Sequence, residues 1–136
     1  TIAELHQKKM DCCIRGFHVY QDIWNPVIGE QLSCVREPRN VVDKYAVAIV
    51  KSDGTVVGHL PKKISMAMSL FILRGGQITC IVTGKRRYSS DLIQGGLEIP
   101  CELSLKSKEK TELTKLLNRL TYLLLKIIAC MCTKVL

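Results

Sequence analysis

Residues 30–63 decide the fold of this chain: EQLSCVREPRNVVDKYAVAIVKSDGTVVGHLPKK. Two apolar runs within it, residues 45–50 and 55–60, flank Ser52-Asp53-Gly54, whose residues tolerate the backbone angles of a tight turn. We therefore predict a β-hairpin. The first run is almost continuously apolar, which is typical of a central strand with both faces covered.

Further elements are predicted on both sides of the hairpin. Apolar and polar side chains alternate, or apolar ones dominate, in residues 14–20, 30–36, 77–84 and 97–105, which indicates four more strands. Pro61 stands at the first position of a predicted helix, and Gly75-Gly76 ends that helix. Residues 1–13 are expected to form a frayed or short helical entry, and residues 85–91 a polar connection.

This order of elements predicts a mainly β fold that closes into a small barrel, because closure removes exposed strand edges. Residues 1–13 would be an N-terminal extension, residues 14–105 the barrel domain with one inserted helix, and residues 106–136 a basic, then apolar, helical tail. The apolar run at 120–133 is shorter than the roughly 20 residues that span a bilayer. We expect the tail helix to dock on its own core or on a protein partner, and not in a membrane.

Composition bounds the function only loosely. The chain has 136 residues and a net charge of +8, but residues 106–136 hold seven Lys and Arg against two Asp and Glu. Global charge is therefore poor evidence for what the core binds. Seven cysteines without a CxxC motif indicate a reducing, intracellular compartment and no zinc site. We expect no metal and no cofactor.

Two polar clusters are candidate sites. His59 precedes Lys62 and Lys63 at the start of the predicted helix, where amide groups and cations bind phosphate. The loop at 36–44 contains the cation Arg39 together with Asn40 and Asp43, and the side-chain oxygens of Asn40 and Asp43 accept hydrogen bonds from hydroxyls. Both clusters also have a purely structural interpretation: solvated lysines beside a packed imidazole, and turn residues that bond their own backbone.

A third candidate cluster is the basic run at 85–87 with Tyr88 beside it, of which we single out Arg86, because single-strand binders combine such charges with aromatic stacking. Tyr20 and Trp24 are further candidates for stacking, although a lone tryptophan is more often part of a core. Catalytic motifs are absent from the sequence: it has no phosphate loop, GxSxG or HExxH. A thiol–imidazole pair of His59 with Cys34 or Cys101 is disfavoured by the apolar surroundings of both cysteines. We expect no enzyme activity from the chain by itself.

The stretch REPRNVVDKYAVAIV followed by VVGHLPKKIS, with Gly29-Glu30 before it and LEIP at 97–100 after it, closely resembles the HIRAN domain. The resemblance covers residues 14–105. The family occurs in fork-remodelling ATPases and as stand-alone proteins. The resemblance implies a six-stranded, OB-like or SH3-like barrel with a pocket for the 3′-hydroxyl end of single-stranded DNA, and hence a nuclear role such as DNA repair.

By position, the resemblance assigns Asp43 to the terminal hydroxyl, Asn40 to its support, His59 and Lys62 to phosphate, and an aromatic near Tyr20 to a terminal base. His18 and Trp24 compete with Tyr20 for that stacking role. The sequence departs from the family at two places. Val41-Val42 stands where the family usually has Pro-Tyr before the aspartate, and Leu97 stands where the DNA-binding member has a phenylalanine.

Three hypotheses follow from the sequence. The first is a binding module for nucleic-acid ends. The second is a protein-interaction module with a degenerate pocket, in which the tail helix docks a partner. The third is a targeting fragment of a larger DNA-dependent ATPase or nuclease.

Overall fold

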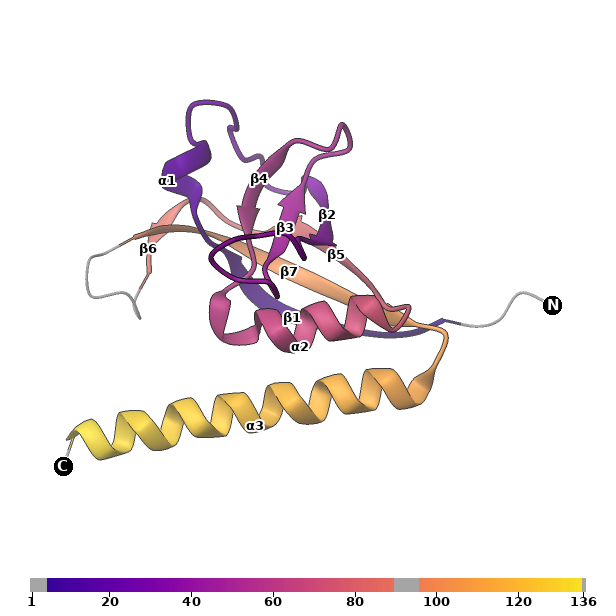
Figure 1. Cartoon of the computed structure of the whole chain (residues 1–136). Helices are drawn as coiled ribbons and strands as arrows, with labels where there is room; N and C mark the ends of the chain where they lie inside the picture. The colour runs from indigo at the N-terminus through magenta and orange to yellow at the C-terminus, as the bar shows by residue number, and fades with distance from the viewer. Residues whose placement is uncertain (1–4, 90–95, 136) are drawn as a thin grey trace.

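Seven strands and three helices form the described part of the chain (Figure 1). The computed structural model describes residues 5–89 and 96–135, with side chains as far as Lys126. In chain order the elements are β1 (His6–Ile14), α1 (Phe17–Tyr20), β2 (Gln31–Arg36), β3 (Val47–Val50), β4 (Val56–His59), α2 (Lys62–Leu73), β5 (Gln77–Val82), β6 (Arg87–Tyr88), β7 (Leu97–Ser107) and α3 (Lys110–Val135). A mainly β fold with an inserted and a C-terminal helix is thus confirmed.

The strands form an antiparallel sheet in the order β1-β7-β5-β2-β3-β4, and β6 pairs with the start of β7. The predicted closed, six-stranded barrel is not confirmed, because there are seven strands and no ladder joins β1 to β4 within the described residues. The two edges of the sheet meet at one bridge, just after β1 and at the end of β4. Arg15 and His59 exchange two backbone hydrogen bonds there, of 2.8 and 3.0 Å.

The N-terminal segment differs from its prediction. Residues 6–13 are not a helical entry but most of β1, which pairs with β7 from His6–Ser107 to Ile14–Ile99. The predicted strand at 14–20 is also wrong, since Gly16 turns the chain at φ 83° and α1 follows. The pairing of β1 joins residues about ninety positions apart, so its stability comes from tertiary contacts that a local pattern does not reveal.

The β3–β4 hairpin and α2 follow their predictions closely. Gly54 takes φ 87° in the turn, where the Asp53 carboxylate accepts the Thr55 N–H at 2.9 Å. Pro61 is the residue before α2 rather than its first helical residue. At the other end of α2, Gly75 takes φ 95°, and the N–H groups of Gly75 and Gly76 donate to the carbonyls of Ile72 and Phe71. This is a Schellman C-cap, which explains the Gly-Gly pair.

The core lies between the sheet and α2. Its fully buried side chains include Ile14, Ile49 and Met68, together with four residues that alternate along β7: Ile99, Cys101, Leu103 and Leu105. Helix α3 runs alongside α2 (Figure 1), where it buries Leu113 and Leu116, and then continues to residues such as Leu124, which is exposed. The predicted docking of the tail on its own core therefore holds for the first turns of α3.

Candidate nucleic-acid interface

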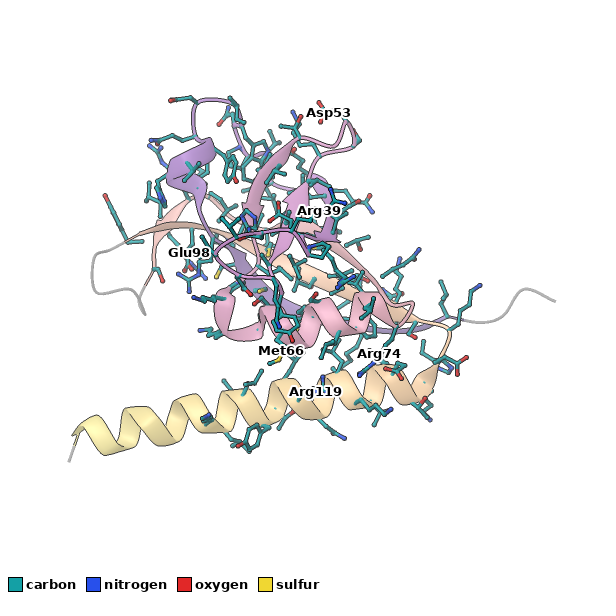
Figure 2. All side chains as sticks on the ribbon, viewed as in Figure 1. Arg39, Asp53, Met66, Arg74, Glu98 and Arg119 are labelled. Carbon is teal, nitrogen blue, oxygen red and sulfur yellow. The ribbon has the colours of Figure 1, made fainter. Side chains whose placement is uncertain are left out.

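An open cleft of about 180 Å³ lies where β4 ends and α2 begins, at the opposite end of the β3–β4 hairpin from its turn. Figure 2 shows Asp53 in that distant turn. The cleft is lined by Asn40, Val42, Asp43, Ala46, His59, Leu60, Lys62 and Ser65. Four residues that the sequence singled out are thus brought together: Asn40, Asp43, His59 and Lys62.

The loop residues Asn40 and Asp43 use their oxygens to shape the cleft. Asn40 Oδ1 accepts the N–H groups of Val42 and Asp43 at 2.9 and 3.0 Å, and Asp43 Oδ1 accepts the Tyr45 N–H at 2.8 Å. The Ser65 hydroxyl lies 3.0 Å from Asp43 Oδ2 and can donate to it, which ties the loop to α2. The turn chemistry proposed as a structural role is therefore present. Each carboxylate oxygen has a second lone pair, so Asp43 can still accept a hydrogen bond from a ligand.

His59 is held from two sides at the rim of the cleft. Its Nε2 lies 2.5 Å from Oε1 of Glu37, and its ring centroid lies 6.4 Å from that of Tyr20. Burial raises the pKa of Tyr20, and the nearby Glu37 charge raises it further, so its phenol keeps its proton. Tyr20 is half-buried, and its position beside His59 suits a ring that contacts a ligand in the cleft.

Positive charge comes from the start of α2 and from the loop. Lys62, Lys63 and Arg39 are all exposed. Among the described residues, no side chain caps the N-terminus of α2, a helix of twelve residues without an acidic residue in its first turn. Such an end presents amide donors and the positive end of the helix dipole, both of which favour anions.

Other predicted residues lie outside the cleft. Arg86 is exposed between β5 and β6 and does not line it. Trp24 is buried, with 3% of its surface exposed, and its Nε1 lies 3.1 Å from Glu30 Oε2, so it is a core residue and cannot stack on a base. His18 is exposed on α1. Among the three aromatic candidates, Tyr20 is the one whose ring lies against a cleft residue, His59, within the described part of the chain.

A buried carboxylate holds β6 in place. Glu98 is 5% exposed, and its two oxygens lie 3.3 Å from Arg15 Nη1 and 3.0 Å from Arg87 Nε. The predicted polar connection at 85–91 therefore contains a short strand, while its last two residues lie outside the described part of the chain. Because Arg15 bridges His59 through its backbone, the Glu98 cluster adjoins the strand that leads into the cleft.

The described residues contain neither a metal-binding cluster nor a reactive thiol at Cys34. No group of three or more His, Cys, Asp or Glu is placed there to hold a metal ion. Burial raises the pKa of Cys34, which leaves its thiol protonated and a poor nucleophile. Across the helices that the structure describes, no segment is long and apolar enough for a membrane span.

Three residues that shape the cleft were missed in the sequence: Glu37, Ser65 and Arg15. Glu37 belongs to the loop that drew attention, but only the fold brings it to His59, 22 residues away. Ser65 follows Lys62 by one helical turn, a spacing that could have suggested a shared face. Arg15 carries no local signal, because its role depends on the distant pairing with His59.

Comparison with known proteins identifies similar chains. The model of the HIRAN domain family matches residues 10–108. The Fanconi-associated nuclease 1 homolog of Arabidopsis thaliana is 34% identical over 72 residues, which are 53% of this chain but 8% of that protein. This chain therefore spans a small part of the length of that relative.

Solved structures show the same fold. The crystal structure of the HIRAN domain of human HLTF has a TM-score of 0.66 at 20% identity, covering 82% of this chain and 87% of that one. The NMR structure of the same domain has a TM-score of 0.58 at 18% identity with the same coverage. The crystal structure of a protein from Lactobacillus plantarum has a TM-score of 0.54 at 16% identity, covering 74% of this chain and 98% of that one.

The family match includes the hairpin, the whole cleft and β7. Since it covers well over half of the sequence, the chain belongs to the HIRAN domain family.

Proposed function

We propose that this domain is a nucleic-acid-binding module that takes the 3′-hydroxyl end of a single DNA strand into the cleft around Asp43. The supporting observation is that one cleft combines a carboxylate with Lys62 at an uncapped helix start. A carboxylate accepts a hydrogen bond from a hydroxyl and repels phosphate, whereas the lysine and the helix amides favour phosphate. The end of a DNA strand offers a free hydroxyl to the carboxylate, and a phosphate one linkage away to the lysine and the helix amides.

The candidate site residues then have distinct roles. Asp43 accepts the hydrogen bond of the terminal hydroxyl, and Asn40 keeps the loop in shape through its two backbone contacts. His59 and Lys62 bind the adjacent phosphate, and Tyr20 contacts the terminal base. Further along the strand, phosphates meet three exposed cations: Arg39, Lys63 and Arg86.

The affinity should be modest. Val42 is 82% exposed at the rim where the family has an aromatic residue, and Leu97 replaces a second aromatic. Loss of a base–aromatic stack costs about 1–3 kcal/mol, which corresponds to roughly one to two decades of affinity. Binding of a bare strand would therefore be weak and sensitive to salt.

Within a longer protein, such a module would direct another activity to DNA ends. The curated relative is a Fanconi-associated nuclease homologue, so we infer a nuclear protein that acts in DNA repair. A second candidate function is protein interaction through α3, which is favoured by Leu124 and Leu125, 58% and 60% exposed.

The test is a titration with labelled oligonucleotides that differ only in a 3′-hydroxyl or a 3′-phosphate, at two salt concentrations. We expect tighter binding of the free hydroxyl at both concentrations, and weaker binding of both strands at high salt because phosphate contacts release counterions. Equal binding of the two strands would show a basic surface without end recognition. No binding at low salt would leave the protein-interaction function.

A further inference from the structure

Helix α3 lies beyond the residues that match the family, since the match ends at 108 and α3 begins at Lys110. Its solvent side has a regular pattern: Lys115, Arg119, Tyr122 and Lys126 follow one another at spacings of four, three and four residues. Such spacing places side chains in one row on a helix. We call this row the α3 stripe. All four residues are exposed, and it extends along about 16 Å of the helix.

The charge of the α3 stripe is positive in the described region. Glu112, one turn before Lys115, is the nearest acidic residue on this side, and it is engaged by Lys115 at 3.6 Å and by Arg74 of α2 at 4.0 Å. Arg119 and Lys126 have no acidic residue within four positions along the helix, and Tyr122 between them is 66% exposed. Cations interleaved with an exposed aromatic are what proteins use to bind single strands.

The α3 stripe leads toward the cleft. Helices α2 and α3 are antiparallel (Figure 1), and Ala67, Phe71 and Arg74 of α2 face Glu112, Leu116 and Arg119 of α3. Arg74 lies opposite Glu112 near the start of α3, and Figure 2 shows Arg119 further along that helix, beyond Arg74.

The same register can be followed to the cleft end of α2. Lys63 shares one row of α2 with Ala67 and Arg74, because it precedes them by four and eleven residues. Ala67 lies opposite Arg119, and the helices are antiparallel. Lys63, four residues before Ala67, is therefore level with Leu123, four residues after Arg119 and between Tyr122 and Lys126. Leu123 packs against the core, so α3 is still in contact at this level. Lys62, the next residue, lines the cleft.

We propose that the α3 stripe is a second binding site for the phosphate backbone of single-stranded DNA, continuous with the cleft through Lys62 and Lys63. This inference rests on the proposed function: the cleft takes the 3′ end, and the strand leads from it over the start of α2 onto Arg119, Tyr122 and Lys126. The row of cations disfavours a second copy of α3 as the occupant, because like charges that face each other across an interface repel.

The experiment compares the variant Arg119→Gln/Lys126→Gln with the control Lys8→Gln/Lys9→Gln, which removes the same charge from β1 at exposed positions. Gln is a good helix former, so α3 should keep its structure, as circular dichroism would check. Each variant is titrated with a strand of about three nucleotides, which fills the cleft alone, and with one of about twelve, which also reaches α3.

We expect the α3 variant to bind the long strand several-fold more weakly, with a salt slope lower by about 1.4, since each single-strand phosphate contact contributes about 0.7. Its affinity for the short strand should equal that of the wild type. The control should match the wild type on both strands.

Equal affinity of the α3 variant and the control for the long strand would overturn the inference. The α3 stripe would then be better explained as a binding site for an acidic protein surface. An equal loss on both strands would also overturn it, because the effect would not depend on strand length. A failure of the proposed function is distinguishable, since it appears in the wild type as no preference for a 3′-hydroxyl on the short strand.

Discussion

The imidazole of His59 and the carboxylate of Glu37 form one unit, with Nε2 and Oε1 2.5 Å apart. The Glu37 carboxylate thus places a negative charge at the rim of the cleft, directly beside the imidazole. The attraction of the cleft for phosphate then depends on Lys62 and on the start of α2.

Replacement of Glu37 should therefore strengthen DNA binding. Glu37→Gln keeps an oxygen that can hold the imidazole and removes a negative charge from the rim of the cleft. We expect roughly twofold tighter binding at low salt, from a charge about 8 Å from the ligand in water, and a smaller gain at high salt. A loss of affinity that does not depend on salt would show that the carboxylate is needed to orient His59.

The Glu98 cluster should contribute more to stability than an ion pair at the surface. Glu98→Gln removes a buried charge that pairs with both Arg15 and Arg87, which we expect to lower the free energy of unfolding by about 1–3 kcal/mol. Glu102→Gln, on the same strand, breaks only a 4.0 Å pair with exposed Lys9 and should cost less than about 1 kcal/mol. Urea denaturation measures both, and equal losses would contradict the structural role of Glu98.

Gly58 permits the close approach of β4 to the end of β1. A Cβ at this position would lie 2.4 Å from Ile14 Cγ2 and 2.8 Å from the Arg15 carbonyl oxygen. Gly58→Ala should therefore destabilise the domain by about 1–3 kcal/mol and also weaken oligonucleotide binding, because His59 is the next residue.

The matched control for Gly58 is Gly54→Asn in the hairpin turn. Gly54 has open space around it, and Asn tolerates its positive φ, so the loss of stability should stay below about 1 kcal/mol with unchanged binding. If Gly58→Ala lowered the melting temperature no more than this control does, the close approach of the two sheet edges at Gly58 would be contradicted.

The thiol of Cys12 should make stability depend on alkaline pH. Hydrogen bonding with Cys101 raises the pKa of Cys12 from 9.0 to about 12. Between these values the unfolded chain loses this proton and the folded chain keeps it, so the free energy of unfolding should fall as pH rises above 9.0, by about 1.4 kcal/mol per pH unit. Cys12→Ala should reduce this slope without abolishing it, because burial also raises the pKa of the Cys34 thiol, and it should leave the dependence at lower pH unchanged. An identical alkaline slope in the variant would exclude Cys12 as its source.

Local chemistry predicted the elements that depend on local rules. The Asp53-Gly54 turn, the Gly75-Gly76 cap and the alternation along β7 each have a cause within a few residues, and each is present. Strand β1 was missed because most of its side chains are exposed and its partner is β7, at the other end of the domain.

The cleft likewise contains residues that the sequence reveals and residues that only the fold brings there. Asn40, Asp43, His59 and Lys62 were found because their residue types and the family resemblance pointed to them. Glu37 and Ser65 reach the cleft only through the packing of a loop against a strand and a helix, which no local pattern encodes. The interpretation of Trp24 as part of the core, which the sequence favoured over base stacking, is confirmed by its burial against Phe17.

Discrimination between strand ends by Asp43 is the most direct test of the account. Asp43→Asn keeps an oxygen for the Tyr45 N–H and an amide that can pair with Ser65, but it loses the negative charge. Asp53→Asn removes an equivalent turn carboxylate, one that accepts the Thr55 N–H far from the cleft. For each variant, the affinity for a 3′-hydroxyl strand is divided by that for a 3′-phosphate strand.

We predict a ratio well above one for the wild type and for Asp53→Asn. For Asp43→Asn the ratio should fall to about one, mainly because the 3′-phosphate is no longer repelled. A ratio that stays unchanged in Asp43→Asn would contradict the central claim that this carboxylate recognises the strand end.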